Sequence, residues 1–265
     1  MLTGILKPTS GDIDVFGFHP FYQRKQYAQI IGVVFGQRTQ LWWDIAVRES
    51  LSLLAKIYSV PDSEYKKRME LFNDVLGLEK LLKRPVRKLS LGERMRCDLA
   101  ASLIHNPKVL FLDEPTIGLD QVAKDSIREF LREINKELKT TIILTTHDLK
   151  EIEELCEKII VLDSGKIIYN GMLEKVKNLP GLKRNLTVDF LEDFTSDAKV
   201  KLNNKFKASF ELESSKKLIA KIDPSILPVA DVVKDIVSNY KVADISISEP
   251  SIEQVISKIY KDGVS

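Results

Sequence analysis

Two adjacent carboxylates close a short apolar run in this 265-residue chain. The run from Lys108 to Leu112 is continuous and apolar, so it predicts a buried, parallel strand that ends at Asp113-Glu114. Ligands of open α/β sheets bind at the carboxyl ends of strands. One carboxylate there can hold a hydrated Mg²⁺ while the other polarises a water molecule. The alternative is that both side chains only begin a loop, and for an isolated pair that alternative is the stronger.

A histidine follows a second apolar run. Thr141 to Thr146 predicts another buried strand, and His147-Asp148 comes directly after it. An imidazole at the end of a neighbouring parallel strand could meet the same ligand and donate a hydrogen bond to a developing negative charge. The alternative is a helix start with Asp148 as its cap. His19 and His105 lack such a context, and we expect both to be structural.

A serine and a glycine precede a predicted helix in the stretch Leu89-Ser90-Leu91-Gly92-Glu93. A hydroxyl, a glycine that allows close backbone approach and a helix N-terminus together form a phosphate-binding corner. The alternative is a plain helix cap, because Ser90 and Glu93 have the spacing of a capping box. Both roles can hold at once.

Strands and helices must alternate to position these residues. The periodicity predicts a strand at 30–35 and helices at 47–58, 62–76, 92–104 and 121–138. We expect Asp62 or Ser63 to cap the second of these helices and Gly77 to end it. At the start of the chain, Met1 to Thr3 reads as the tail of a helix and residues 12–16 as a strand. This alternation is typical of an α/β domain with a largely parallel sheet.

The pattern changes after Gly171. Before it, the pattern predicts a hairpin at 158–169; after it, strands at 186–190, 208–213, 218–222 and 242–247 and helices at 229–240 and 251–260. We therefore expect a first domain at 1–172, a linker at 173–184 and a small α+β domain at 185–265.

Composition narrows the classes of function. The net charge is +2, from 40 basic and 38 acidic residues, which gives no support for a nucleic-acid-binding surface. The two cysteines, Cys97 and Cys156, lack metal-type spacing and predict reduced thiols. No apolar run approaches the roughly 18 residues that span a bilayer. Any membrane role must therefore come through a partner.

The order of these motifs resembles that of an ABC (ATP-binding cassette) ATPase subunit over about residues 1 to 172. The matching segments are Gln37 for the Q-loop, Leu89 to Glu93 for the LSGGQ signature, Leu110 to Pro115 for the Walker B strand, Gly118-Leu119-Asp120 for the D-loop and Thr146-His147-Asp148 for the switch histidine. The resemblance implies a P-loop-NTPase-like cassette with a helical signature subdomain at about 45–105. It also implies that two cassettes, identical or different, enclose two ATP molecules.

The resemblance further implies a role for each site residue. Asp113 would hold Mg²⁺ through water, Glu114 would polarise the attacking water and His147 would contact the γ-phosphate. Gln37 would contact Mg²⁺ or water, and Asp120 would line the interface between the cassettes. The signature residues would face ATP held by the partner cassette; these are Ser90, Leu91, Gly92 and Glu93.

The family resemblance also implies a peripheral subunit on the inner face of the cell membrane that powers a transporter, most similar to exporter-type cassettes with separate membrane subunits. The permease would dock around Gln37 to Asp44. Trp42 and Trp43 would lie near its groove, and the alternative for both indoles is core packing.

The sequence departs from the family pattern at several points. Leu91 replaces a glycine of the signature, and Glu93 replaces its glutamine. The Q-loop is one residue longer than usual, so Gln40 is the alternative to Gln37. The aromatic residue that would stack on adenine is missing.

The phosphate-binding motif G-x-x-x-x-G-K-[ST] does not occur in the sequence; Gly165-Lys166 belongs to the predicted hairpin. We therefore expect the chain to be a fragment in which Met1 is an internal methionine, and we expect no ATP hydrolysis by the chain alone. The alternatives are a non-catalytic cassette that donates its signature to a partner's ATP, or a non-transport ABC ATPase acting in translation or DNA repair.

Overall fold

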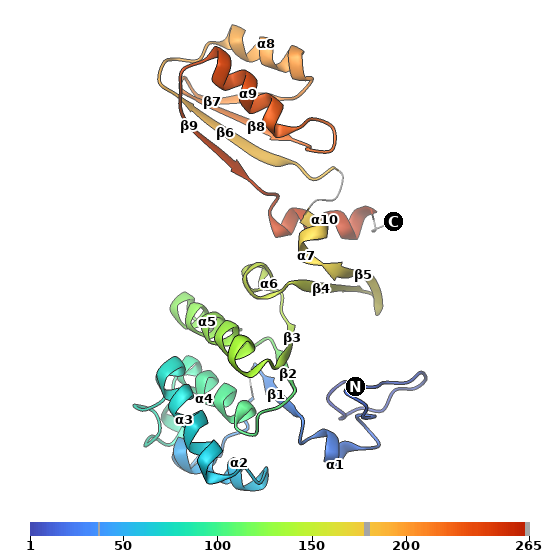
Figure 1. Ribbon diagram of the computed structural model, residues 1–265, viewed down its shortest axis with the longest axis vertical. Coiled ribbons are helices and arrows are strands. Elements are labelled where there is room, and N and C mark those ends of the chain that lie inside the picture. Colours follow the sequence, from blue (N-terminus) through green and yellow to red (C-terminus); the bar gives the residue numbers. More distant parts are fainter. Residues whose placement is uncertain (37, 178–180, 263–265) are drawn as a thin grey trace. The chain divides into compact units, whose positions relative to one another are not determined.

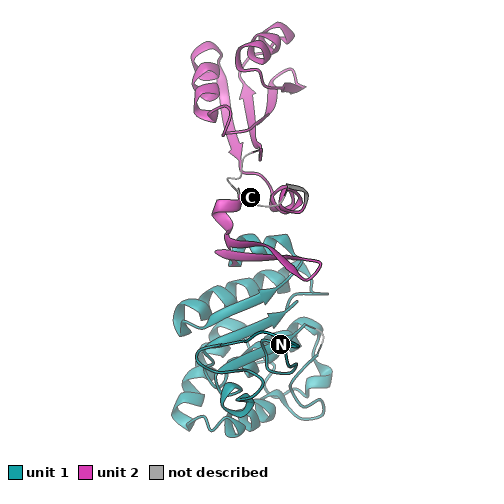
Figure 2. Ribbon diagram, turned by 90° about the vertical axis from the view of Figure 1, so that its right-hand side faces the viewer, with its two compact units in different colours: residues 1–155 teal, residues 156–265 magenta. Residues whose placement is uncertain are grey.

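The computed structural model describes residues 1–36, 38–177 and 181–262. The chain divides into two compact units, residues 1–155 and residues 156–265, which Figure 2 colours separately. Each unit has its own hydrophobic core. The predicted domain boundaries at 172 and 185 stay predictions.

A three-stranded parallel sheet organises the first unit (Figure 1). Its order is β1 (Ile31–Phe35), β2 (Val109–Asp113) and β3 (Thr141–Thr145). The register aligns Phe35 with Asp113 and Asp113 with Thr145. The predicted parallel α/β sheet is thereby confirmed, and the three strands end at one edge, where the chemistry-bearing residues follow.

Strand β3 corrects the prediction of a second buried strand. β2 is buried from Val109 to Leu112, whereas the side chains of β3 alternate between exposed and half-buried. Ile143 is 39% exposed. The reason is topological, because β3 is an edge of the described sheet while β2 is its centre. An apolar run shows that a strand can be buried, but its neighbours decide whether it is.

The first residues also differ from the prediction. Met1 to Thr3 are not helical, and residues 12–16 form no strand. Val15 instead makes an isolated bridge with Phe18 across a tight turn at Gly17, where φ is +81°. Short alternation of apolar residues suits such a turn as well as it suits a strand.

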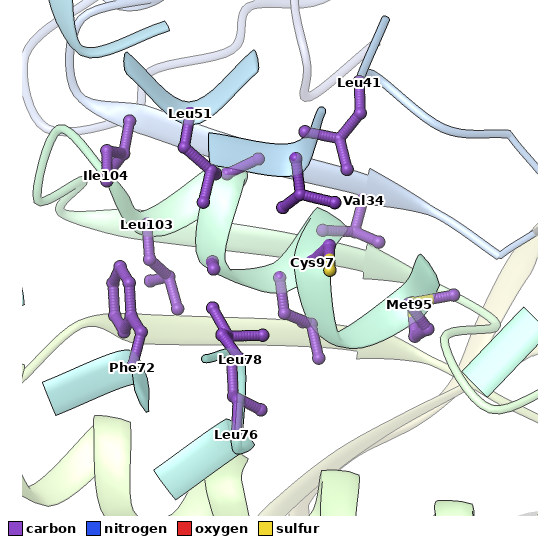
Figure 3. Packing of buried hydrophobic residues seen from close by; sticks show 14 of the residues in the cluster. Val34, Leu41, Leu51, Phe72, Leu76, Leu78, Met95, Cys97, Leu103 and Ile104 are labelled. Atoms are coloured by element: carbon purple, nitrogen blue, oxygen red, sulfur yellow. The ribbon is translucent and has the colours of Figure 1, made fainter. Parts of the chain in front are cut away.

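Helices cover the sheet and complete the core of the first unit (Figure 3). They are α1 (Arg24–Tyr27), α2 (Val47–Ile57), α3 (Asp62–Leu76), the 3₁₀ turn η1 (Val86–Lys88), α4 (Leu91–Leu103), α5 (Gln121–Leu138) and α6 (Leu149–Leu155). Apolar residues at helical spacing, such as Val47, Leu51 and Leu54, are buried on one face of α2. Helix α4 packs so tightly on β1 that a Cβ at Gly32 would lie 2.4 Å from the carbonyl oxygen of Ser102.

The ends of α3 were predicted in part. Gly77 ends the helix in the left-handed conformation, as expected. The predicted side-chain cap at Asp62 or Ser63 is wrong, because Pro61 is the N-cap and makes no side-chain cap. Asp62 is the first helical residue, where its carboxylate still favours the positive end of the helix dipole.

The second unit contains a hairpin and a four-stranded antiparallel sheet. β4 (Lys158–Asp163) and β5 (Lys166–Met172) form the predicted hairpin, which is followed by α7 (Leu173–Lys177). The sheet has the order β7 (Phe210–Ser214), β8 (Lys217–Ile222), β6 (Arg184–Phe190) and β9 (Val242–Ser248). With α8 (Ser196–Phe206) and α9 (Val229–Asn239) it forms a β-α-β-β-α-β unit of ferredoxin-like topology, and α10 (Ile252–Asp262) follows. Helix α8 was not predicted.

Candidate functional site

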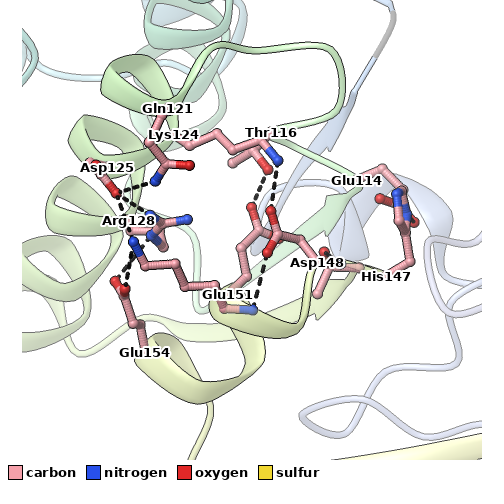
Figure 4. Close-up of polar contacts among 12 residues, drawn as sticks. Glu114, Thr116, Gln121, Lys124, Asp125, Arg128, His147, Asp148, Glu151 and Glu154 are labelled. Carbon is pink, nitrogen blue, oxygen red and sulfur yellow. Dashed lines mark hydrogen bonds and ion pairs between the residues drawn. The ribbon is translucent and has the colours of Figure 1, made fainter. Parts of the chain in front are cut away.

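The carboxyl ends of β2 and β3 bring the predicted catalytic pair together (Figure 4). Glu114 follows β2 and His147 follows β3, and the His147 Nδ1 atom lies 2.8 Å from Glu114 Oε1. The Glu114 backbone N–H donates to the Thr145 carbonyl oxygen at 3.0 Å. The structure therefore joins two residues that are 33 positions apart in the sequence.

This pair is electrostatically coupled. The hydrogen bond and the charge of Glu114 raise the pKa of His147 above that of an ordinary imidazole. Asp148 acts in the same direction, and Lys124 opposes it. The His147 side chain is 74% exposed, so solvent and a ligand can reach it. A protonated imidazole at this position suits an anionic ligand.

Asp113 lies beside the pair at the end of β2. Its side chain is exposed, and its Oδ1 atom accepts a hydrogen bond of 2.5 Å from the Thr145 hydroxyl. Among the described residues, no group of three or more histidine, cysteine or acidic side chains could enclose a metal ion. Mg²⁺ at phosphate sites takes only one or two protein carboxylates, and substrate phosphates and water fill its other positions. Asp113 fits a Mg²⁺ ion that arrives with a phosphate ligand.

The end of β1 passes close to this loop. Gly36 N–H donates to the Asp113 carbonyl oxygen at 2.8 Å, and a Cβ at Gly36 would lie 2.2 Å from the Glu114 carbonyl oxygen. Only glycine permits this approach. Glu114 itself has a positive φ of 50°, which is uncommon for a non-glycine residue and turns the chain sharply after β2. Gln37, predicted to contact Mg²⁺ or water, lies outside the described residues.

Ser90 caps helix α4, as the capping-box alternative predicted. Its Oγ atom accepts from Glu93 N–H at 3.2 Å, and Glu93 Oε2 accepts from Ser90 N–H at 2.8 Å. This backbone hydrogen bond, aided by Arg84 at 2.7 Å, lowers the pKa of Glu93. Ser90 is exposed at the helix N-terminus, and its side chain is also hydrogen-bonded to the Glu93 carboxylate. Glu93 is therefore held on its own helix.

The next two residues of the predicted signature lie against the predicted D-loop and the first turn of α5. A Cβ at Gly118 would contact Leu91 Cδ2 at 3.3 Å, and a Cβ at Gly92 would contact Ala123 Cβ at 3.2 Å. Asp120 is exposed and caps α5, because its Oδ1 atom accepts from Ala123 N–H at 2.9 Å. The candidate residues thus form two clusters, with Asp113, Glu114 and His147 in one and Leu91, Gly92 and the D-loop in the other.

A buried carboxylate that sequence reasoning missed ties the segment after Gln37 to α4. Asp98 is 4% exposed, and its Oδ1 atom accepts from the Thr39 hydroxyl at 2.8 Å and from Gln40 N–H at 3.1 Å. Burial raises the pKa of Asp98 to about 6. The Gln40 side chain donates to the Asp98 carbonyl oxygen at 3.1 Å, so this alternative Q-loop glutamine is turned toward α4. The available signal was an acidic residue between Cys97 and Leu99 on a buried helix face.

The two tryptophans lie at the surface of the first unit. Trp42 is 39% exposed and Trp43 is 49% exposed, so core packing does not account for either indole. The Arg94 guanidinium lies 5.5 Å from the centre of the Trp43 ring, which is a cation–π distance. This aromatic surface stands beside the segment that Asp98 holds.

Known proteins resemble the part of the chain that carries these clusters. A family model described as ABC transporter matches residues 1–117. The ABC transporter ATP-binding protein NatA of Bacillus subtilis is 35% identical over 176 residues, which is 66% of this chain and 71% of NatA. The chain belongs to the ABC transporter ATP-binding family. This ABC chain spans less of other relatives. It covers 62% of the energy-coupling factor protein EcfA2 of Clostridium perfringens at 36% identity. It covers 51% of the methionine import protein MetN of Geobacillus kaustophilus at 35% identity.

Solved structures support the same fold. CbiO1 of Clostridium perfringens, part of the ABC transporter complex CbiONQ, has a TM-score of 0.58 at 35% identity, over 66% of this ABC chain and 71% of that chain. An ATP-binding subunit of another ABC transporter has a TM-score of 0.59 at 24% identity and supports the fold alone. Within the described residues, no helix of this ABC chain has the length and apolar character to cross a membrane.

We predict that Asp98→Asn stabilises the first unit increasingly as the pH rises. The folded-state pKa of about 6 lies above the ordinary value of 3.8, so the folded chain binds more protons between these values and loses stability as the pH rises through them. The ionised carboxylate should cost about 3 kcal/mol at neutral pH. Urea unfolding at pH 4 and pH 7.5, followed by the fluorescence of Trp42 and Trp43, measures this difference.

Asp74→Asn, on the exposed face of α3, is the matched control for this measurement and should show no such pH dependence. Parallel pH profiles for Asp98→Asn and the unmodified chain would contradict the prediction.

We also predict that Ser90→Ala destabilises the first unit by about 1 kcal/mol, because α4 loses its N-cap acceptor. Ser63→Ala should be nearly neutral, since Ser63 lies in the first turn of α3 without capping it. Ser90→Asp should retain the stability of the unmodified chain. Urea unfolding followed by tryptophan fluorescence compares the three variants, and equal costs at Ser90 and Ser63 would show that the capping box contributes nothing.

Proposed function

We propose that this chain supplies the water-activating and signature parts of an ABC ATPase that powers a membrane transporter. The observation that carries the proposal is the Glu114–His147 hydrogen bond at the shared end of β2 and β3. An exposed carboxylate, Asp113, lies next to it. An acid, a paired imidazole and a second acid at a sheet edge form a suitable site for phosphoryl transfer to water.

In this proposal each residue of the cluster has one task. Glu114 accepts a hydrogen bond from the attacking water and orients it toward the γ-phosphate. His147, whose pKa Glu114 raises, donates to the phosphate oxygens. Asp113 would hold the hydration shell of Mg²⁺, and that ion would neutralise charge on the phosphates. Gln37, which lies outside the described residues, would contact Mg²⁺ or water and report the nucleotide.

The signature cluster acts on a different ATP molecule in this proposal. Ser90, Gly92 and the first backbone N–H groups of α4 face ATP bound by a second cassette. The exposure of Ser90 at the N-terminus of α4 supports this role. Leu91 packs on its own D-loop and Glu93 completes the cap, so both shape the corner from within the chain. Asp120 would line the cassette interface.

We propose that turnover also needs a phosphate-binding loop supplied from outside these 265 residues, because the sequence contains no G-x-x-x-x-G-K-[ST] motif. The lysine and backbone nest of that loop supply much of the charge stabilisation of phosphate. The second candidate function, donation of the signature to a partner's ATP, uses only Ser90, Gly92 and their helix. The intact Glu114–His147 pair favours the first.

The membrane partner in this proposal is a permease that docks at Gln37 to Asp44. The exposed Trp42 and Trp43, anchored next to α4, support an aromatic docking surface there. Relatives named for methionine import and for bacitracin transport are similarly close to this chain, at 35% and 33% identity. The export direction that we propose therefore rests on the sequence resemblance alone.

We predict that the chain alone shows no Glu114-dependent ATP hydrolysis. A version extended at its N-terminus by the residues encoded upstream, if these include a phosphate-binding loop, should hydrolyse ATP with Mg²⁺. In that version Glu114→Gln should lower kcat by about 100-fold or more, because the water loses its polarising base. Release of inorganic phosphate is the measurement.

Glu129→Gln, on the exposed face of α5, is the control and should leave kcat unchanged. Hydrolysis by the chain alone that disappears with Glu114→Gln would contradict the need for an external loop. Hydrolysis by the extended chain that survives Glu114→Gln would contradict the role of Glu114. An upstream stop codon without a phosphate-binding loop would favour the signature-donor function.

A further inference from the structure

Two segments that follow neighbouring strands of the sheet carry the paired residues. One is the loop of residues 114–120, after β2; the other is residues 146–151, after β3, which leads into α6. Where the two segments leave the sheet, the Glu114 N–H donates a hydrogen bond to the Thr145 carbonyl oxygen. Beyond that point, the Glu114–His147 contact is largely exposed, at 32% and 74% of the two side chains.

A buried hydrogen bond joins the same two segments a second time. The Thr116 hydroxyl donates to Glu151 Oε1, and the two residues are 3% and 0% exposed (Figure 4). Thr116 lies two residues after Glu114, and Glu151 lies four residues after His147. The exposed catalytic pair is thus enclosed between the sheet at one end and a buried link at the other.

The buried link is the stronger constraint on geometry. Exposed ion pairs fix little, because water competes for both partners. A buried carboxylate is costly unless it is hydrogen-bonded. Within the described part of the chain, the Thr116 hydroxyl is the sole hydrogen-bond partner of the Glu151 carboxylate. The loop of Thr116 therefore cannot leave α6 without leaving a buried carboxyl group with no hydrogen-bond partner among the described residues.

An ion pair also joins the residue before α6 to α5. Asp148 Oδ2 lies 2.7 Å from Lys124 Nζ, and Asp148 Oδ1 accepts from Lys150 N–H at 3.1 Å. The Asp148 N–H donates to the Thr146 hydroxyl oxygen at 2.9 Å. His147 is therefore carried by a segment that is anchored on both sides, with Asp148 and Lys124 as the charged groups nearest to it besides Glu114.

We propose that Glu151 is a positioning residue that, through Thr116, holds His147 in hydrogen-bond contact with Glu114. Thr116 belongs to the same loop as Asp120, which the proposed function places at the cassette interface. A partner that presses on this loop shifts Thr116, and Glu151 passes that shift to the segment that carries His147. The link joins the dimer interface to the hydrolytic pair within one chain. This inference rests on the proposed function only for the role of the pair.

The experiment measures the pKa of His147 by NMR on the full chain without nucleotide. The chain has three histidines, so the imidazole signals are few. In the unmodified chain the pKa of His147 should be raised by Glu114, and Glu114→Gln should remove that shift. Thr116→Val, which keeps the shape but removes the hydroxyl, should lower the pKa of His147 toward that of a free imidazole. Thr116→Ser should keep the unmodified value.

His105 reports on folding in the same spectra. Its side chain is half-buried, with Nε2 2.8 Å from the Ile31 carbonyl oxygen, and desolvation lowers its pKa to about 4. If Thr116→Val loses this signature, the double variant Thr116→Val/Glu151→Met replaces both polar partners by apolar groups of similar shape and keeps the interior filled. It should fold and still show the lowered pKa of His147.

A folded Thr116→Val chain, or a folded double variant, with an unchanged pKa of His147 would overturn the proposal. A loss of the shift in Thr116→Ser equal to that in Thr116→Val would also overturn it, because the hydroxyl would not be the cause. A pKa of His147 that ignores Glu114→Gln would instead count against the catalytic pair, and so against the proposed function.

Discussion

The register between β2 and β3 is the constraint on which the site depends. Parallel pairing of Asp113 with Thr145 brings both strand ends to one edge at the same height. Glu114, directly after Asp113, and His147, two residues after Thr145, then meet across this edge. A shift of one residue would move every side chain to the opposite face of the sheet. The buried Val109 to Leu112 run, which must stay in the core, therefore fixes the chemistry indirectly.

Helix α4 transmits position from one cluster to another. Its N-terminus is closed by the Ser90–Glu93 capping box, and two turns later Asp98 holds Thr39 and Gln40. Between them, Met95 and Cys97 are buried, and residues 91–94 and 96 are half-buried. Helix α4 therefore connects the signature corner at its N-terminus with the segment after Gln37. The energetic cost is a buried carboxylate whose pKa is raised to about 6.

Periodicity predicted most elements of the fold, and the structure brings the predicted residues Asp113, Glu114 and His147 together at one sheet edge, while their roles stay predictions. Strand β2, helix α5 and the hairpin of β4 and β5 follow from apolar patterns that few other structures satisfy. The prediction failed where the neighbouring elements determine burial. Strand β3 is apolar but lies at an edge of the described sheet. Helix α8 buries only Leu202, so its sequence carries little helical periodicity. Asp98 and Glu151 could not be recognised, because a single acidic residue in a helix reads as solvent-facing until its neighbours are known.

The replacement of a signature glycine by Leu91 is consistent with this arrangement. A leucine there reaches the D-loop at Gly118, where φ is +75°, and Gly92 leaves space for Ala123 of α5. Leu91 has less backbone freedom than glycine, but its side chain provides a packing contact between the signature corner and the loop that contains Thr116. Because Thr116 is bonded to Glu151 beneath that loop, the contact continues from α4 through the D-loop to α6. The two clusters of candidate residues are therefore mechanically connected inside a single chain, although their proposed ligands are different ATP molecules.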